Sequence, residues 1–233
     1  LHDALQSCQV LATAAGVEAE QVLPFSTGVI GEPLPMDRLL AGIPGALANL
    51  SGQGWSDAAK GILTTDTRAK GSSLQFAAGE GQITITGISK GSGMIKPNMA
   101  TMLGYVATDA ALDSELLHRA LRLATNKSFN RITVDADTST NDSIMLVATG
   151  TSGVVIDETL FEQFVEQLSL VFIELAQAII RDGEGATKFV SVIVEGAADS
   201  AEALAVAYTI AESPLVKTAL TASDANWGRI LAA

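Results

Sequence analysis

Apolar and polar residues follow one another in patterns that predict helices and strands in turn along the chain. The longest pattern with helical spacing runs from Glu158 to Arg181 and ends at Asp182-Gly183, a pair typical of a helix stop. Apolar residues alternate with small or polar ones on both sides of Gly79-Glu80-Gly81, which predicts a β-hairpin. Shorter patterns predict helices near the start of the chain and over 36–50, 57–63, 113–125, 201–211 and 214–221, and strands over 22–30, 73–78, 83–88, 102–106, 131–135, 144–149 and 189–195.

Pairs of strands that alternate with pairs of helices predict an α/β fold. We expect an α+β layered sandwich, with two β-sheets and helices on their outer faces. The run 189–195 is apolar almost throughout, which is typical of a central strand. With 233 residues, of which 48% are hydrophobic, the chain can bury a large core as one large domain or two small ones.

The charge of the chain narrows its choice of partners. A net charge of -12 argues against nucleic acid or an anionic membrane surface, because both would repel the protein. The single cysteine, Cys8, lies in the apolar pattern of the first predicted helix, so we expect a buried thiol and no internal disulfide. No stretch approaches the roughly 20 apolar residues that span a bilayer, and the first residues do not resemble a signal peptide. We therefore expect a cytoplasmic protein.

The segment from Lys90 to Gly104 indicates chemistry. Two glycines and Pro97 make its first part irregular, and the apolar residues after Thr101 predict a strand. A threonine hydroxyl needs a base, and the free α-amino group of the same residue, with a reference pKa of about 7.7 to 8.0, can act as one. That amine is freed if Thr101 attacks the Ala100 carbonyl and water hydrolyses the ester. The same residues also fit the ordinary start of a strand.

This segment closely resembles the self-cleavage segment of the ornithine acetyltransferases, also called glutamate N-acetyltransferases or bifunctional arginine-biosynthesis proteins. In that family the threonine after a Met-Ala pair is the nucleophile. The family pattern more often has glycine where Ala136 stands, a departure that concerns local turn geometry. The resemblance covers essentially the whole chain, and the other matching segments are Ser26-Thr27-Gly28-Val29-Ile30-Gly31, Thr64-Thr65-Asp66-Thr67, Ser128 to Asp142, Arg181-Asp182-Gly183-Glu184-Gly185-Ala186-Thr187-Lys188 and Asn226-Trp227-Gly228-Arg229-Ile230-Leu231.

The resemblance implies a self-cleaving enzyme of the N-terminal-nucleophile type, cut between Ala100 and Thr101. Thr101 is then the nucleophile, and its freed amine is the base. The resemblance assigns the oxyanion hole to the hydroxyl of Thr27 and the backbone N–H of Gly28. Such donors stabilise the oxyanion that forms during acyl transfer. A strand end closed by a glycine turn is the alternative explanation of the Thr27-Gly28 pair.

Three more residues are implied to bind substrate together with Thr101. Lys90 would pair with a substrate carboxylate as a point charge. Thr67 would contact the substrate through its hydroxyl, and Glu184 would hold a substrate ammonium. Judged by residue chemistry alone, the alternatives are Thr64 and Thr65 for Thr67, and Asp182 for Glu184.

The implied reaction moves an acetyl group from N2-acetyl-ornithine to Thr101 and then to glutamate, a ping-pong mechanism in cyclic arginine biosynthesis. Some family members also use acetyl-coenzyme A as donor and others do not, and the sequence does not distinguish them. We expect no cofactor, and acetyl-coenzyme A would enter only as a substrate. We also expect no metal, because the polar loop 135–142 lacks the sixth-position glycine and the final glutamate of a calcium loop. Two alternatives stay open. One is an aminopeptidase or amidase of related fold that uses water as acceptor, and the other is an uncut fragment or subunit with a structural role.

Cleavage would divide the chain into 1–100, the end of an α fragment, and 101–233, the start of a β fragment. We expect the two to pack as one body, and the resemblance implies a heterotetramer of two α and two β fragments. Family members extend beyond both ends of this sequence, so we expect a longer precursor. The tail after Ala233 is where the family places further substrate contacts, an asparagine and a threonine or serine. The partners expected are small-molecule substrates.

Overall fold

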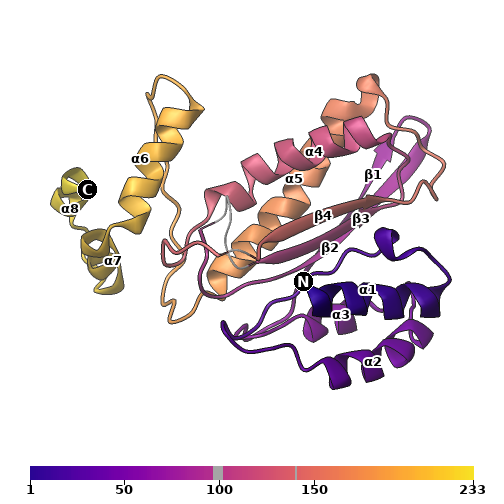
Figure 1. Ribbon diagram of the computed structural model, residues 1–233. Coiled ribbons are helices and arrows are strands. Elements are labelled where there is room, and N and C mark those ends of the chain that lie inside the picture. The colour runs from indigo at the N-terminus through magenta and orange to yellow at the C-terminus, as the bar shows by residue number, and fades with distance from the viewer. Residues whose placement is uncertain (97–101, 140) are drawn as a thin grey trace. The chain divides into compact units, whose positions relative to one another are not determined.

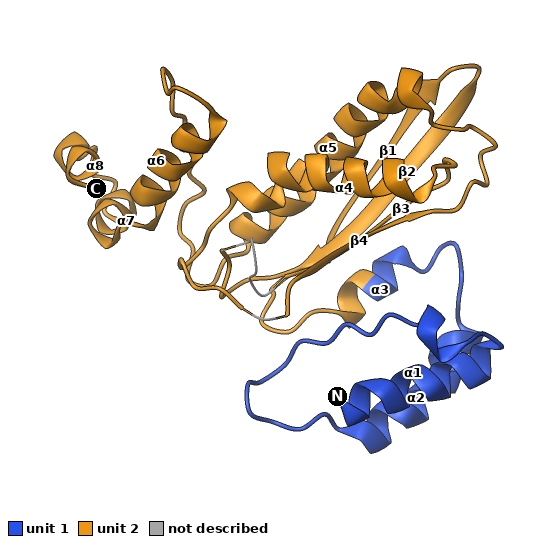
Figure 2. Cartoon of the chain, turned by 45° about the horizontal axis from the view of Figure 1, so that its top comes forward, with its two compact units in different colours: residues 1–58 blue, residues 59–233 orange. Residues whose placement is uncertain are grey.

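The computed structural model describes residues 1–96, 102–139 and 141–233. They form two compact units, 1–58 and 59–233, which Figure 2 shows in different colours. The predicted nucleophile Thr101 and its neighbour Ala100 lie outside the described residues.

The first unit is helical. It contains α1 (His2–Ala15), a 3₁₀ turn (Ala19–Gln21), α2 (Met36–Ala48) and the first residues of α3 (Trp55–Gly61). Helix α1 ends at Gly16, whose φ of 73° lets its N–H reach the carbonyl of Ala12. Cys8 is buried on α1, as predicted.

The predicted strand 22–30 is wrong, because this segment is irregular in the structure. Val29 and Ile30 are 77% and 83% exposed. A strand needs a neighbour to satisfy its backbone N–H and C=O groups, and the described part of the first unit contains no strand that could pair with it.

The second unit is built on a four-stranded sheet with strand order β1-β2-β3-β4. The predicted hairpin is confirmed as β1 (Lys70–Ala78) and β2 (Gly81–Lys90), which pair antiparallel around Gly79 with its φ of 57°. Strand β3 (Leu103–Thr108) pairs antiparallel with β2 and parallel with β4 (Ser143–Ala148). Strands β2 and β3 lie on opposite sides of the predicted cleavage site, so the two predicted fragments share this sheet.

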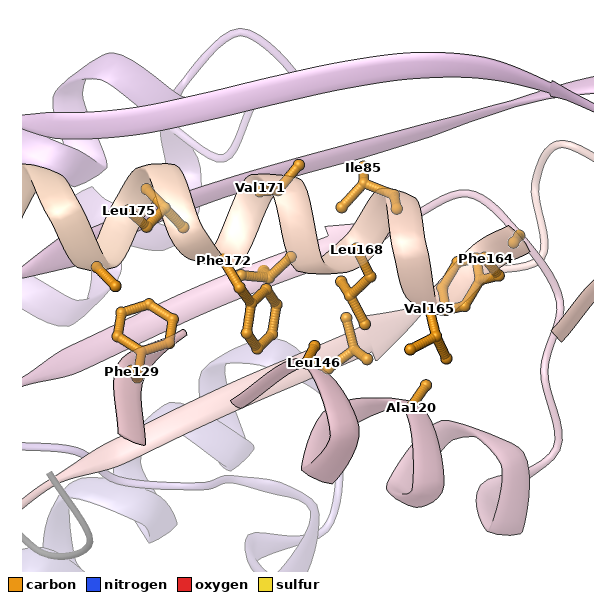
Figure 3. Packing of buried hydrophobic residues seen from close by; sticks show 14 of the residues in the cluster. Ile85, Ala120, Phe129, Leu146, Phe164, Val165, Leu168, Val171, Phe172 and Leu175 are labelled. Carbon is orange, nitrogen blue, oxygen red and sulfur yellow. The ribbon is translucent and has the colours of Figure 1, made fainter. Parts of the chain in front are cut away.

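Helices α4 (Ser114–Lys127) and α5 (Glu158–Arg181) cover one face of the sheet (Figure 1). Side chains of α5 pack among residues of the sheet and of α4, and Figure 3 shows this core, in which Phe172 meets Phe129 edge to face at 5.5 Å. Gly87 permits this packing, because a Cβ there would lie 2.7 Å from Val106 and 3.0 Å from Leu175. The α5 side chains with 0% exposure are Phe164, Leu168, Phe172, Leu175 and Ile179.

Helix α5 is the one described helix whose length and composition would also suit a membrane span. Its 24 residues include an 18-residue window with a mean hydropathy of 1.3. Half of that window is buried, because the apolar residues recur every three or four positions and face the sheet. The helix is therefore a core helix of this unit.

Two further predicted strands are wrong. Residues 131–135 follow a 3₁₀ turn (Phe129–Arg131) and are irregular, and so are residues 189–195, in which Ile193 is 80% exposed. The described residues therefore contain one sheet, where the sequence predicts two. An apolar run predicts burial but does not provide a neighbouring strand, and neither segment pairs with a strand of the described sheet. The chain continues through α6 (Ser200–Glu212), α7 (Pro214–Thr221) and α8 (Trp227–Ala232).

Candidate functional site

The structure brings three of the predicted site residues into one region of the second unit. Lys90 is the last residue of β2, Thr67 lies in the turn before β1, and Glu184 follows α5. Lys90 pairs with Leu103 in the sheet, so the predicted nucleophile is two residues along the chain from the partner of Lys90.

A buried ionic cluster joins these segments. The Lys70 ammonium lies 2.5 Å from Asp66 Oδ1 and 2.6 Å from Asp182 Oδ2, and the three side chains are 0–2% exposed. Burial raises the pKa of both carboxyls, but hydrogen bonds from Lys70 and, for Asp66, from the Gly91 N–H outweigh it and hold the net pKa below the usual range. Both carboxyls are therefore ionised. The cluster ties the turn before β1 to the end of α5 and to the loop after β2.

Thr67 is fixed by this cluster through Asp182. Its backbone N–H donates to Asp182 Oδ2 at 3.0 Å, and its hydroxyl donates to Asp182 Oδ1. Thr67 is itself exposed. Of the three threonines in the turn, Thr67 is the one whose side chain is bonded to the end of α5, which favours it over Thr64 and Thr65.

Lys90 is buried, and no carboxylate of the described residues lies within hydrogen-bond distance of its ammonium. It is 2% exposed, and its ammonium lies 4.0 Å from Asp66 Oδ2, beyond hydrogen-bond distance. Burial lowers the pKa of Lys90 and the charge of Lys70 lowers it further, while the charges of Asp66, Asp142 and Glu184 raise it. Such an ammonium gains a partner when a substrate carboxylate approaches.

Glu184 is held against the loop after β2. Its backbone N–H donates to Ser92 O at 2.8 Å, and the Ser92 hydroxyl donates to Asp182 O at 2.8 Å. A Cβ on Gly93 would lie 2.8–3.0 Å from the Glu184 carboxylate atoms, so glycine is required for this approach. Glu184 is exposed, whereas both Asp182 oxygens already accept hydrogen bonds. Of the two acids, Glu184 is therefore the one free to bind a ligand.

Asp142 is a residue of this region that sequence reasoning missed. Its Oδ1 accepts the Met102 N–H at 2.5 Å, and its Oδ2 is buried with no partner among the described residues. Burial raises the pKa of Asp142 to about 7, although the Met102 N–H and the charge of Lys90 act in the opposite direction. Asp142 thus anchors the residue that follows Thr101. The available signal was its place at the end of the matching segment from Ser128.

The polar loop before Asp142 is organised by hydrogen bonds. Asp135 accepts the backbone N–H groups of Met94 at 2.6 Å and Ile95 at 3.0 Å. Ala136 has a φ of 69°, a left-handed conformation that glycine adopts without strain.

Among residues 1–96, 102–139 and 141–233 there is no group of three or more side chains that could hold a metal ion.

The predicted oxyanion-hole residues lie in the first unit. Thr27 is half-buried and Gly28 exposed, in the irregular segment 22–30. A Cβ on Gly28 would meet no atom within 4 Å, so packing within the described residues does not explain a glycine there. The oxyanion role of this pair stays a prediction.

Comparison with known proteins agrees with the resemblance. The chain is 56% identical to arginine biosynthesis bifunctional protein ArgJ of Pseudomonas syringae pv. tomato, covering 99% of this chain and 58% of that protein. It is 55% identical to the protein of the same name from Pseudomonas fluorescens, covering 96% of this chain and 56% of that protein. The chain thus spans somewhat more than half the length of these curated relatives.

A solved structure and a family model extend the match. The crystal structure of arginine biosynthesis bifunctional protein argJ from Bacillus halodurans superposes with a TM-score of 0.52 and 47% identity, over 53% of this chain and 60% of that one. The superposition agrees with the mixed α/β class predicted from the sequence. The model of the ArgJ family matches residues 1–233, the full sequence. The chain therefore belongs to the ArgJ family.

Proposed function

We propose that the protein transfers an acetyl group from N2-acetyl-ornithine to glutamate in arginine biosynthesis, through an acetyl ester on Thr101. The observation that carries the proposal is the convergence of a buried cation, a hydroxyl oxygen and an exposed carboxylate at Lys90, Thr67 and Glu184. The relatives support it, since they are named as arginine biosynthesis bifunctional proteins.

These three groups suit the head that both amino-acid substrates share. The Lys90 ammonium would pair with the α-carboxylate. The Thr67 oxygen would accept an N–H of the α-nitrogen, and Glu184 would attract the ammonium of the departing or entering amino acid. One subsite would therefore orient ornithine and glutamate in turn, as a ping-pong reaction requires.

The proposed steps at Thr101 follow from its chemistry. The Thr101 hydroxyl attacks the Ala100 carbonyl, and the C–N bond to Thr101 breaks, which leaves an ester and frees the Thr101 amine. Water then hydrolyses the ester and releases the Ala100 carboxylate and the Thr101 hydroxyl. That amine then takes the hydroxyl proton as the oxygen attacks the acetyl carbonyl of the donor, and it passes the proton to the departing ornithine nitrogen. The glutamate amine next attacks the acetyl ester and gives up a proton to the Thr101 amine. The Thr101 amine passes this proton to the Thr101 oxygen as the C–O bond breaks and N-acetyl-glutamate leaves. The Thr27 hydroxyl and the Gly28 N–H are proposed to stabilise the oxyanion.

An acetyl-transfer assay tests the proposal. Ornithine release from N2-acetyl-ornithine should depend on glutamate, and N-acetyl-glutamate should form in equal amount. Release that needs no glutamate would instead support an aminopeptidase or amidase that uses water. A parallel assay with acetyl-coenzyme A and glutamate decides whether the protein also uses this second donor. We propose no bound cofactor.

We also infer that the cut fragments stay together, as a heterotetramer of two α and two β fragments, in the cytoplasm. Pairing between β2 and β3 supports the continued association of the fragments, because β2 precedes the cut and β3 follows it. Native mass spectrometry of the protein produced from its complete coding sequence tests the assembly. A mass that corresponds to one α and one β fragment would contradict it. Cell fractionation tests the compartment.

A further inference from the structure

Asp182 holds Thr67 in a fixed hydrogen-bonding state. The Asp182 carboxylate is 2% exposed and accepts four interactions. Thr67 donates its N–H to Oδ2 and its hydroxyl to Oδ1, Lys70 lies 2.6 Å from Oδ2, and Arg68 Nε lies 3.7 Å from Oδ1. Each of these partners is a donor or a cation, so the carboxylate acts only as an acceptor.

The direction of the hydrogen bond decides what Thr67 can offer a ligand. A hydroxyl has one proton and two lone pairs, and an ionised carboxylate can only accept. The proton of Thr67 is therefore committed to Asp182, and its oxygen can offer any further partner lone pairs alone. The Lys70 ammonium, 2.6 Å from Oδ2, keeps the carboxylate ionised and the direction of the hydrogen bond fixed.

We propose that Asp182 is a positioning residue that makes Thr67 an obligate hydrogen-bond acceptor for an N–H on the α-nitrogen of the substrate. The inference rests on the proposed function and deepens it. Both an acetamido N–H and an α-ammonium can donate to Thr67, so one oxygen serves the donor and the acceptor substrate. A substrate with an ester oxygen in place of the α-nitrogen has no N–H to donate. The lone pairs of that ester oxygen would face the lone pairs of the Thr67 oxygen, which is repulsive. The site thereby selects α-amido and α-amino acids against 2-acyloxy acids.

A matched pair of substrates isolates this contact. N2-acetyl-ornithine and its ester analogue 2-acetoxy-5-aminopentanoate differ by an N–H against an oxygen. Esters are intrinsically more reactive, so the informative quantity is how a substitution changes the ratio of kcat/KM for the amide to kcat/KM for the ester. Thr67→Val removes the hydroxyl at an exposed position, and Thr67→Ser is the matched control that keeps it.

Thr67→Val should lower kcat/KM for the amide by about tenfold to a hundredfold, since a donor loses its acceptor, and leave kcat/KM for the ester unchanged or higher. Thr67→Ser should keep the ratio within about threefold of the wild type. Equal losses on the two substrates in Thr67→Val would overturn the inference. A wild-type protein that transfers no acetyl group from N2-acetyl-ornithine to glutamate would instead refute the proposed function.

Asp182→Asn tests the positioning role itself. The side-chain amide that this substitution introduces can donate to the Thr67 oxygen, which frees the hydroxyl proton to point toward the ligand. The ratio of kcat/KM for the amide to kcat/KM for the ester should then fall, as in Thr67→Val, and kcat/KM for the ester should rise. A merely structural role would lower kcat/KM for both substrates equally and leave the ratio unchanged, which would contradict the inference. If this variant fails to fold, the Thr67→Val result decides the question.

Discussion

Replacing Lys70 by methionine should destabilise the protein more than any exposed lysine replacement. The Lys70, Asp66 and Asp182 side chains are 1%, 0% and 2% exposed, so water does not screen the charges. Methionine fills a similar volume but leaves two buried carboxylates without their shared cation. Breaking a buried pair in this way costs about 3 to 5 kcal/mol. Lys127→Met, at an exposed position in the last turn of α4, is the control and should change stability by less than about 0.5 kcal/mol.

The loss should also depend on pH. In the wild type, the pKa values of Asp66 and Asp182 are lowered on folding, so their stabilisation is present above the unfolded pKa and lost as the pH falls through the folded values. In Lys70→Met, burial instead favours the protonated carboxyls. The loss of unfolding free energy relative to the wild type should therefore be largest near pH 7 and smaller near pH 4.

Urea unfolding followed by circular dichroism, in a Thr101→Ala background that keeps one chain, measures both effects. If Lys70→Met lowers the unfolding free energy by less than about 1 kcal/mol at neutral pH, the buried ion cluster is refuted, because the three charges must then be solvated. A deficit that grows as the pH falls would refute the assigned direction of the pKa shifts.

Three further predictions concern the same region. Asp142→Asn should keep the hydrogen bond to the Met102 N–H. Folding raises the pKa of Asp142 to about 7, so the contribution of Asp142 to wild-type stability falls as the pH rises from 4 to 8, and the variant has no such loss. The thermal midpoint of the variant should therefore gain on that of the wild type between pH 5 and pH 8, and a constant difference would contradict this. Ala136→Gly should stabilise the protein by about 0.5 to 1 kcal/mol in urea unfolding, since relief of left-handed strain exceeds the entropy cost of glycine, and a loss of stability would refute the strain. Gly93→Ala should displace the Glu184 carboxylate and raise KM for N2-acetyl-ornithine by about tenfold, and an unchanged KM would mean that Glu184 does not contact the substrate.

The spacing of apolar residues correctly predicted the elements that are stabilised by contacts between residues close together in the sequence. The hairpin around Gly79 and helices α4 and α5 follow from alternation and from helical spacing, and the structure confirms them. The strands predicted over 22–30 and 189–195 have the same apolar character but no partner strand among the described residues. Pairing depends on residues far away in the sequence, so a pattern within one segment cannot establish it.

The site was predictable only as separate segments. Resemblance singled out Lys90, Thr67 and Glu184, but no local pattern shows that they meet. Their meeting depends on Asp182 and Lys70, which are 112 residues apart in the sequence. Residue chemistry alone left Asp182 as an alternative to Glu184, and burial of the Asp182 carboxylate supports the choice that the resemblance makes.

The proposed acetyl transfer depends on a cut before Thr101 and an acetyl ester on the Thr101 side chain. The most direct test is the mass of the denatured protein after incubation with N2-acetyl-ornithine, without and then with glutamate. We predict two fragments that meet between Ala100 and Thr101, with one acetyl group on the fragment that begins at Thr101 and its loss when glutamate is added. A single uncut chain that still transfers acetyl groups to glutamate would contradict the proposed mechanism.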